Sequence, residues 1–248
     1  MRILSFSTSD TTGGASRAAL RLHNGLIASG IDEKMIVRFK NSEIPSVIDI
    51  NTIAKNSQNI FQLAWSIVLK KLGFAKSVWS DYPKKKGYLS VLKSSTLNIG
   101  LTKFDFDLIN LHWVSEFINF KEFKNISKPI IWTLHDCNAF TGICHIINDC
   151  QRFKSECKCC PYLESEQSDI STKMFYYKLK YYENLDLNIV APSAWLARQA
   201  SESVLLKSRT IRIIPNGIDT EKFNPLKKTI AKEALGFNQD KALLLFGA

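Results

Sequence analysis

Short apolar runs separated by longer amphipathic stretches dominate the pattern of hydrophobic and polar positions along this chain. The runs cover residues 3–7, 35–39, 107–111, 130–134, 188–191 and 210–214, and polar or turn residues bound each of them. Short bounded runs, several of them rich in β-branched residues, are typical of buried parallel strands. We therefore predict a strand at each of these six positions.

Helical periodicity fills the intervals between the runs. Residues 15–28, 172–185, 194–206 and 230–235 are predicted helices, and in the first of them Ala15, Ala18, Ala19, Leu22 and Leu26 follow the spacing of one helix face. Strands that alternate with helices form βαβ units. The pattern thus predicts an α/β fold with a doubly wound, mostly parallel, Rossmann-like sheet.

The pattern changes toward the C-terminus, which indicates a second domain. We predict an N-terminal Rossmann-like domain at 1–218, an interdomain linker at 219–240, and the first strand of a truncated C-terminal domain at 241–248. The apolar positions of that strand are 242–246. The alternative is that this strand closes the first sheet and that no second domain follows.

Positive charge is the main feature of the composition. The formal net charge of the 248 residues is +10, which suits phosphates, an acidic lipid surface or nucleic acid. It equally suits solvated lysines with no partner. A broad apolar helical face within 56–87, followed by lysines, poses the same choice between a membrane surface and packing on the sheet, and we favour packing.

The chain carries no sign of export. Residues 1–7 lack the features of a signal peptide, and the longest apolar run, 60–69, is too short to cross a bilayer. We therefore expect a cytoplasmic protein. Because thiols there are kept reduced, the six cysteines favour a metal site or free thiols over disulfides.

Two glycines, Gly13 and Gly14, follow the first predicted strand and precede a helix. Glycines let backbone amides approach an anion, and a helix N-terminus adds partial positive charge. The residues do not form the dinucleotide-binding fingerprint or a P-loop. A phosphate contact and a purely steric need for glycine in a tight turn both stay open.

Histidine stands at the ends of two predicted strands, in the pairs His112-Trp113 and His135-Asp136. Ligands bind beyond the carboxyl ends of strands in open α/β sheets, and imidazole can move a proton or bind a hydroxyl near neutral pH. Asp136 could orient an imidazole, accept from a hydroxyl or cap the next turn.

Four cysteines, Cys144, Cys150, Cys157 and Cys160, have the spacing C-x5-C-x6-C-x2-C, with Cys159 as a spare. Four thiolates can close a tetrahedral structural zinc site, which leaves no open position for catalysis. His145 could replace one thiolate. Free thiols, or two disulfides in an exported protein, are the alternatives.

Taken together, the motifs resemble the N-terminal half of the family 4 nucleotide-sugar glycosyltransferases, in particular bacterial exopolysaccharide enzymes of the colanic-acid type. The matching residues span nearly the whole chain: Gly13-Gly14, Leu111-His112-Trp113, Trp132-Thr133-Leu134-His135-Asp136, the cysteine segment, Ala191-Pro192-Ser193, and Ile214-Pro215-Asn216-Gly217-Ile218-Asp219 with Phe223. The resemblance implies the GT-B arrangement of two facing Rossmann-like domains.

The same resemblance implies a function and roles for these residues. A retaining enzyme of this kind transfers a sugar from a nucleotide donor to a saccharide acceptor, often lipid-linked at the inner membrane face, without a catalytic metal. Gly13 and Gly14 would contact the donor diphosphate, His135 would act in catalysis, and His112, Trp113, Asp136 and Asn216 would contact acceptor or sugar. Without a second domain the chain should show no transfer.

Two other functions remain as alternatives. A zinc-stapled basic module could bind nucleic acid or an acidic protein, but it leaves the histidines and the diglycine turn unexplained. A nucleotide-sugar epimerase would share the two-domain shape but not the cysteine segment. The transferase interpretation requires Gly14 and His135 to lie close enough to share one ligand, and it expects no nucleic acid.

Overall fold

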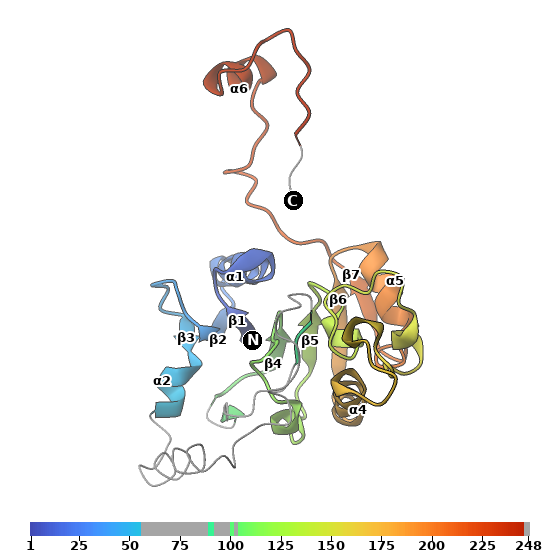
Figure 1. Ribbon diagram of the computed structural model, residues 1–248. Coiled ribbons are helices and arrows are strands. Elements are labelled where there is room, and N and C mark those ends of the chain that lie inside the picture. The colour runs from blue at the N-terminus through green and yellow to red at the C-terminus, as the bar shows by residue number, and fades with distance from the viewer. Residues whose placement is uncertain (56–88, 92–99, 102–103, 246–248) are drawn as a thin grey trace. The chain divides into compact units, whose positions relative to one another are not determined.

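The computed structural model of the chain describes residues 1–55, 89–91, 100–101 and 104–245. The chain divides into two compact units, Met1–Asn216 and Gly217–Ala248, whose helices and strands are labelled in Figure 1. The lysine-flanked stretch at 56–87 lies outside the described residues. Among the described helices, none combines the length and the apolar character that a membrane span requires.

A parallel sheet forms the centre of the first unit. Its seven strands, counted over the described residues, run in the order β3-β2-β1-β4-β5-β6-β7, and every neighbouring pair is parallel. The strands are β1 (Arg2–Ser9), β2 (Asp32–Phe39), β3 (Val47–Asp49), β4 (Leu108–Leu111), β5 (Ile130–Thr133), β6 (Leu187–Ala191) and β7 (Ile211–Ile213). The predicted α/β, Rossmann-like parallel sheet is confirmed, and only the short β3 was missed.

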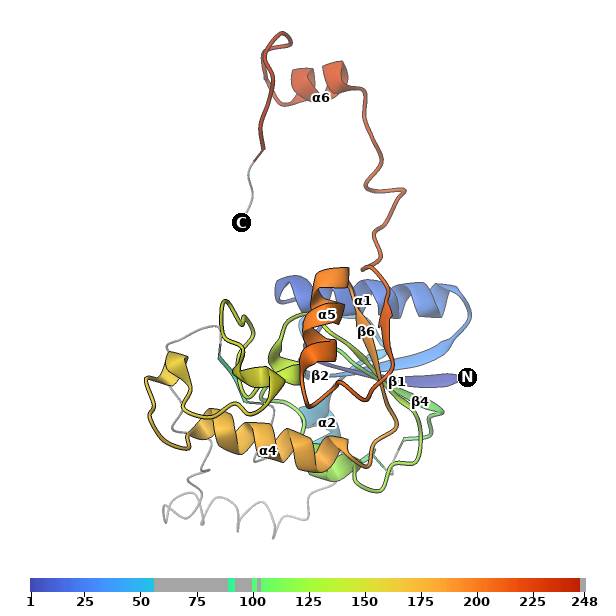
Figure 2. The same cartoon turned by 90° about the vertical axis from the view of Figure 1, so that its right-hand side faces the viewer.

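Helices cover both faces of this sheet, as a doubly wound fold requires. In Figures 1 and 2, α1 (Gly13–Ala28) and α5 (Ala194–Glu202) lie on one face, and α2 (Ile50–Lys55) and α4 (Ile170–Tyr182) lie on the other. A capping box between Asp169 and Thr172 starts α4, and the Ser193 side chain accepts from the Leu196 amide to start α5. Ser193 is therefore the N-cap of α5.

The buried face of α1 differs from the predicted one. Ser16, Ala19 and His23 are its buried residues, whereas Leu22 is 41% exposed. His23 faces the sheet because its Nε2 lies 2.8 Å from Ser46 Oγ and its Nδ1 lies 3.4 Å from Glu33 Oε2. A buried polar pair thus replaces the expected apolar stripe, and the prediction for Leu22 was wrong.

A buried lysine joins α4 to the loop after β5. The Nζ atom of Lys178 donates to the carbonyl oxygens of Asn138 (2.5 Å), Thr141 (2.8 Å) and Gly142 (2.9 Å). Burial lowers the pKa of Lys178 to about 7. This side chain therefore fixes three backbone carbonyls of the loop from inside the core.

The second unit contains one helix, α6 (Lys228–Ala234), within its described part. The predicted strand at 242–246 is not formed over residues 242–245, and the sheet of the first unit ends at β7. The division into two domains and the alternative, that this segment closes the first sheet, both stay predictions. A strand forms only beside a partner that completes its hydrogen bonds.

Gly142 gives a direct test of how tightly the loop packs on α4. A Cβ atom at Gly142 would lie 2.1 Å from Ser171 Oγ and 2.6 Å from Ser171 O, whereas one at Gly25 in α1 would meet nothing within 4 Å. We expect Gly142→Ala to lower the free energy of unfolding by about 1–3 kcal/mol. The control Gly25→Ala should raise it, by up to about 1 kcal/mol. Urea unfolding measures both, and equal effects would contradict this packing.

Candidate functional site

The candidate site lies where the winding of the sheet reverses. β1 and β4 are neighbours in the sheet, but the chain continues from β1 to β2 on one side and from β4 to β5 on the other. The carboxyl ends of two such strands border the crevice in which doubly wound folds bind ligands. Here β1 leads to Gly13 and Gly14, and β4 leads to His112 and Trp113.

The N-terminus of α1 presents backbone amides at this point. Gly13 has a φ of +86°, and a Cβ atom at Gly14 would meet nothing within 4 Å. The N-cap residue Thr12 makes no side-chain cap, and the first turn holds no acidic residue. The partial positive charge of the helix end is therefore not neutralised by a side chain of that turn, which suits an anion.

One cavity of about 570 Å³ joins this helix end to the histidine side of the sheet. Six of the seven non-cysteine site residues predicted from sequence line it: Gly13, Gly14, Trp113, His135, Asp136 and Asn216. Its size is that of a small-molecule site. Gly14 and His135 therefore border the same space, as the transferase interpretation requires.

His112, the seventh predicted residue, lies beneath the cavity and contacts His135. Its side chain is 3% exposed, and its Nδ1 lies 3.1 Å from Nε2 of His135. The two rings stack with centroids 5.4 Å apart. His112 therefore does not line the cavity itself, but it contacts the imidazole of His135, which does.

Hydrogen bonding determines which nitrogen of each ring carries the proton. The Nδ2 amide of Asn110 lies 3.0 Å from His112 Nε2, and Asn110 Oδ1 faces the hydroxyl of Thr133 at 3.5 Å. An amide N–H that donates to Nε2 leaves the His112 proton on Nδ1, which then donates to His135. His135 accepts at Nε2 and therefore keeps its own proton on Nδ1.

Both imidazoles are neutral at physiological pH. Burial, together with the neighbouring His135, lowers the pKa of His112 to about 3. Burial also lowers the pKa of His135 to about 4, although the adjacent Asp136 carboxylate raises it in part. A neutral His135 can donate one hydrogen bond to a ligand but cannot act as a cationic acid.

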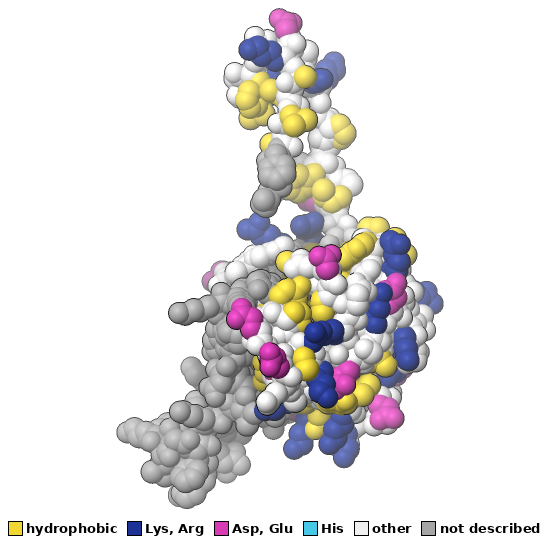
Figure 3. Space-filling view, turned by 45° about the vertical axis from the view of Figure 1, so that its right-hand side comes forward, with side chains coloured by type: hydrophobic (Ala, Val, Ile, Leu, Met, Phe, Trp, Pro, Cys, Tyr) yellow, Lys and Arg dark blue, Asp and Glu magenta, His cyan; other side chains and the backbone are white. Residues whose placement is uncertain are grey.

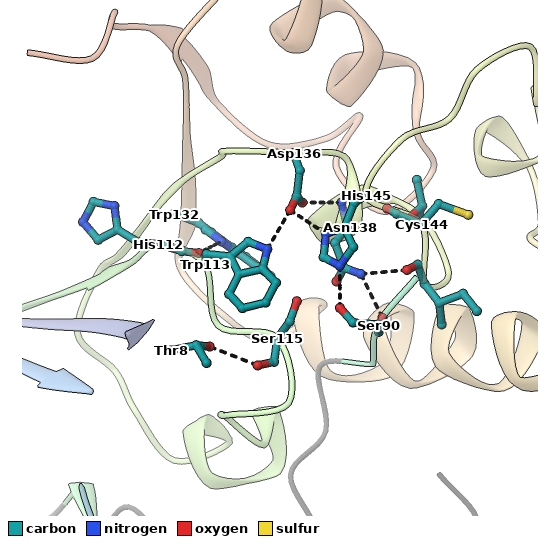
Figure 4. Close-up of polar contacts among 12 residues, drawn as sticks. Thr8, Ser90, His112, Trp113, Ser115, Trp132, Asp136, Asn138, Cys144 and His145 are labelled. Carbon is teal, nitrogen blue, oxygen red and sulfur yellow. Dashed lines mark hydrogen bonds and ion pairs between the residues drawn. The ribbon is translucent and has the colours of Figure 1, made fainter. Parts of the chain in front are cut away.

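Asp136 is held by Trp113, which follows β4, and by Asn138 and His145 of the loop after β5, as Figure 4 shows. Its Oδ2 accepts from Trp113 Nε1 at 2.8 Å and lies 2.5 Å from His145 Nδ1, and its Oδ1 accepts from the Asn138 amide at 2.8 Å. Three partners leave the carboxylate little capacity for a ligand. Its capping role and its orienting role are both present.

His145 extends this network to Ser90, since its Nε2 lies 2.7 Å from Ser90 Oγ. The order serine, histidine, aspartate is that of a hydrolase triad. However, Ser90 is only 6% exposed and does not line the cavity. The arrangement therefore orients Asp136 and Trp113. It also engages both ring nitrogens of His145, and the option of His145 in place of one thiolate stays a prediction.

The cysteines lie apart from the cavity. Cys144, Cys157 and Cys160 are buried and Cys150 is half-buried, and no disulfide joins them. Among the described side chains, no three from His, Cys, Asp and Glu are close enough in these positions to hold a metal ion together.

Sequence reasoning missed several residues that build the site. Asn110 contacts His112, Asn138 contacts Asp136, and Ser90 contacts His145. Asp10 accepts from the amides of Asn41 and Ser42 to fix the turn before α1. Asp10 directly follows β1, and Asn110 and Asn138 each lie two residues from the partner, so these three had a local signal, whereas the contact of Ser90 depends on tertiary structure.

Comparison with known proteins identifies the same family that the sequence motifs resemble. The family model described as Glycosyltransferase Family 4 matches residues 12–222. Over 232 residues the chain is 25% identical to the "Putative colanic acid biosynthesis glycosyl transferase WcaC" of Escherichia coli K12, an alignment that covers 88% of this chain and 55% of that protein. The chain thus spans about half the length of this relative.

The neutral histidine pair predicts how stability depends on pH. Because both pKa values lie below the unfolded value of about 6.5, the unfolded chain binds more protons between pH 6.5 and 4. As the pH is lowered from 6.5 to 4, the free energy of unfolding should therefore decrease, by about 1.4 kcal/mol per pH unit for each imidazole that stays fully neutral in the folded chain. His112→Gln should reduce this slope in urea titrations at several pH values, and an unchanged slope would contradict the assignment.

The hydrogen-bond direction predicts the tautomers. In long-range 1H–15N NMR spectra at pH 7, His112 and His135 should both carry the proton on Nδ1, although free histidine prefers Nε2. The variants His112→Gln and His135→Gln assign the signals. A proton on Nε2 of either ring would show that the direction is wrong.

Proposed function

The chain belongs to Glycosyltransferase Family 4, and on that premise we propose that it forms one wall of a retaining glycosyltransferase site. The reaction would move a sugar from a nucleotide-sugar donor to a saccharide acceptor in bacterial surface polysaccharide synthesis. The observation that supports this most directly is the single cavity bordered by Gly14 and His135. A diphosphate and the sugar it carries could occupy this space together.

The helix end of the cavity suits the donor diphosphate. Gly13 and Gly14 line the cavity at the N-terminus of a 16-residue helix, where the amides of the first turn have no partner within the helix. As the glycosidic bond to the nucleotide breaks, negative charge grows on the leaving diphosphate, and preorganised amides stabilise such charge. In this proposal the helix end takes the part that a metal ion plays in other transferases.

The histidine end of the cavity suits the transferred sugar. His135 would donate its Nδ1 proton to a sugar hydroxyl or to the diphosphate, and Trp113 offers an apolar surface beside it. A neutral donor positions the sugar without repelling the positive charge that develops on its ring. The relation of Asp136 to the acceptor would be indirect, because protein donors already hold its oxygens.

The location and the acceptor follow from the same proposal. The name of the Escherichia coli relative refers to colanic acid, a polysaccharide, and we propose a cytoplasmic protein that meets a lipid-linked acceptor at the inner membrane face. The net charge of +10 suits an anionic membrane surface.

A nucleic-acid or acidic-protein module is the second candidate. It rests on the charge and on the cysteines, and on the face drawn in Figure 3 the Lys and Arg side chains are interspersed with Asp and Glu. Salt-sensitive binding of generic RNA or DNA that is unaffected by His135→Ala would favour this candidate over the transferase.

The donor end can be tested on the 248-residue chain itself. In 1H–15N NMR titrations, inorganic pyrophosphate should shift the amides of Gly13 and Gly14 and the ring of His135. Gly14→Ala places a methyl group in the cavity and should weaken binding by about tenfold, or about 1.4 kcal/mol. Gly25→Ala, on the same helix, is the matched control. Equal effects of the two variants would contradict the proposed diphosphate site.

We further propose that the same chain shows no transfer on its own, because the lining of the cavity is assigned in this proposal to the diphosphate and the sugar and not to the nucleoside. Radiolabelled sugar nucleotides incubated with the chain and a lipid extract measure this. Turnover by the 248 residues would contradict the dependence on a second domain, while leaving the site assignment intact.

A further inference from the structure

A second cavity of the first unit lies at the opposite edge of the sheet from the candidate site. Its volume is about 520 Å³. Its walls come from η2 (Phe120–Phe123), a short 3-10 helix that leads into the amino end of β5, and from the end of α4, which leads into the amino end of β6. The lining residues are Lys121, Lys124, Lys180, Tyr181, Glu183 and Asn184.

Positive charge predominates in this lining. Three lysines from two separate elements meet a single carboxylate, that of Glu183, which leaves a net charge of +2. Within the described part of the chain, none of the three lysines forms an ion pair with a carboxylate. Like charges gathered in a concave surface repel one another and attract an anion. The charge of the cavity therefore suits an anionic ligand.

The end of a helix normally repels an anion, and here Arg209 offsets that effect. The last carbonyl groups of a helix carry partial negative charge. The guanidinium of Arg209 donates to the carbonyl oxygens of Tyr182, of Glu183 at 3.3 Å and of Leu185 at 2.9 Å. Arg209 thus occupies the carbonyls that follow α4 and places a further positive charge beside the lining.

The two walls of the cavity are held together by contacts between α4 and the start of η2. The hydroxyl of Tyr177 donates to Asn119 Oδ1 at 2.6 Å, and the same oxygen accepts from the Lys121 amide at 3.1 Å. The ring of Tyr177 also packs on that of Tyr181, with centroids 4.8 Å apart. The Nζ atom of Lys180 lies 5.7 Å from the centroid of the Tyr181 ring, within the range of a cation–π contact.

These contacts fix the spacing between the backbones that carry the lysines. A site whose walls are already in place loses less entropy when it binds a ligand. The ammonium groups are also compact charges with three donors each, which suits the oxygens of a phosphate.

We propose that this cavity binds a phosphate group that carries two or more negative charges, on a small molecule or on a lipid headgroup. Lys121 and Lys124 would contact the phosphate oxygens from the η2 wall, and Lys180 from the α4 wall. A volume of about 520 Å³ also leaves room for an organic part beside the Tyr181 ring.

This site is separate from the diphosphate site proposed at the start of α1. The residues that carry it precede the amino ends of β5 and β6, whereas Gly14 and His135 follow the carboxyl ends of β1 and β5. The proposal therefore holds whether or not the chain transfers sugars. Gly14→Ala distinguishes the two sites, since it should weaken only the binding at α1.

A titration with inorganic pyrophosphate gives the first test. In 1H–15N NMR spectra of the 248-residue chain, pyrophosphate should shift the amides of Lys124, Tyr181 and Asn184, and uncharged glucose should not. Added NaCl should weaken the binding, because salt screens exposed charges. The same shifts should persist in Gly14→Ala. Absence of pyrophosphate shifts at these three amides in the wild type would overturn the proposal.

Single substitutions test the lysines. Lys124→Gln and Lys180→Gln should each weaken pyrophosphate binding at this site by about fivefold, the loss expected for one charge contact near the surface. Lys173→Gln is the matched control, because Lys173 is an exposed lysine of α4 that does not line the cavity. Equal effects of Lys180→Gln and Lys173→Gln would overturn the assignment.

Vesicles identify the source of the phosphate once the pyrophosphate shifts are observed. If the ligand is a headgroup, phosphatidylglycerol vesicles should retain the wild-type chain, phosphatidylcholine vesicles should not, and Lys124→Gln and Lys180→Gln should both reduce retention. If the ligand is a soluble compound, retention should be absent or the same in the wild type and in both variants.

Discussion

The reversal of strand order between β1 and β4 is the constraint on which the rest of the site depends. Because all strands are parallel, their carboxyl ends lie at one edge of the sheet. After β1 the chain turns to one side, toward β2, and after β4 it turns to the other side, toward β5, so a crevice opens between the two segments. The start of α1 and the imidazole of His112 are therefore neighbours through backbone pairing. The functional groups at this edge are the glycines that follow β1 and the histidines that follow β4 and β5.

The chemistry of the two walls is complementary. The α1 end is positive and built from backbone, so it binds charge without a side chain that could titrate. The opposite wall holds two neutral imidazoles, because burial of His112 and His135 disfavours their protonated forms. A ligand with charge at one end and hydroxyl groups at the other matches this asymmetry, and the sugar diphosphate that we propose has these two ends.

The extent to which sequence predicted this arrangement follows from the range of each interaction. Six strands were predictable because buried parallel strands are continuously apolar, whereas the three-residue β3 is too short for that signal. The edge that carries Gly14 and His135 followed from the strands. The buried face of α1 could not be predicted in this way, because His23 is buried where it contacts Glu33 and Ser46, which are distant in sequence. Likewise, Trp113 and His145 reach Asp136 only through tertiary folding, whereas the amide of Asn138 is a local partner.

The loop after β5 extends control of the cavity beyond this strand, which ends at Thr133. Asn138 donates its side-chain amide to the carbonyls of Ser90 and Ile143 while its own carbonyl accepts from Lys178. The position of Asp136, and through it that of Trp113, is therefore determined by hydrogen bonds that originate in α4 and the cysteine segment. Because each of these bonds is buried and directional, loss of one would leave an unpaired polar group inside the core. A constraint on the loop can therefore alter the cavity without contacting any ligand.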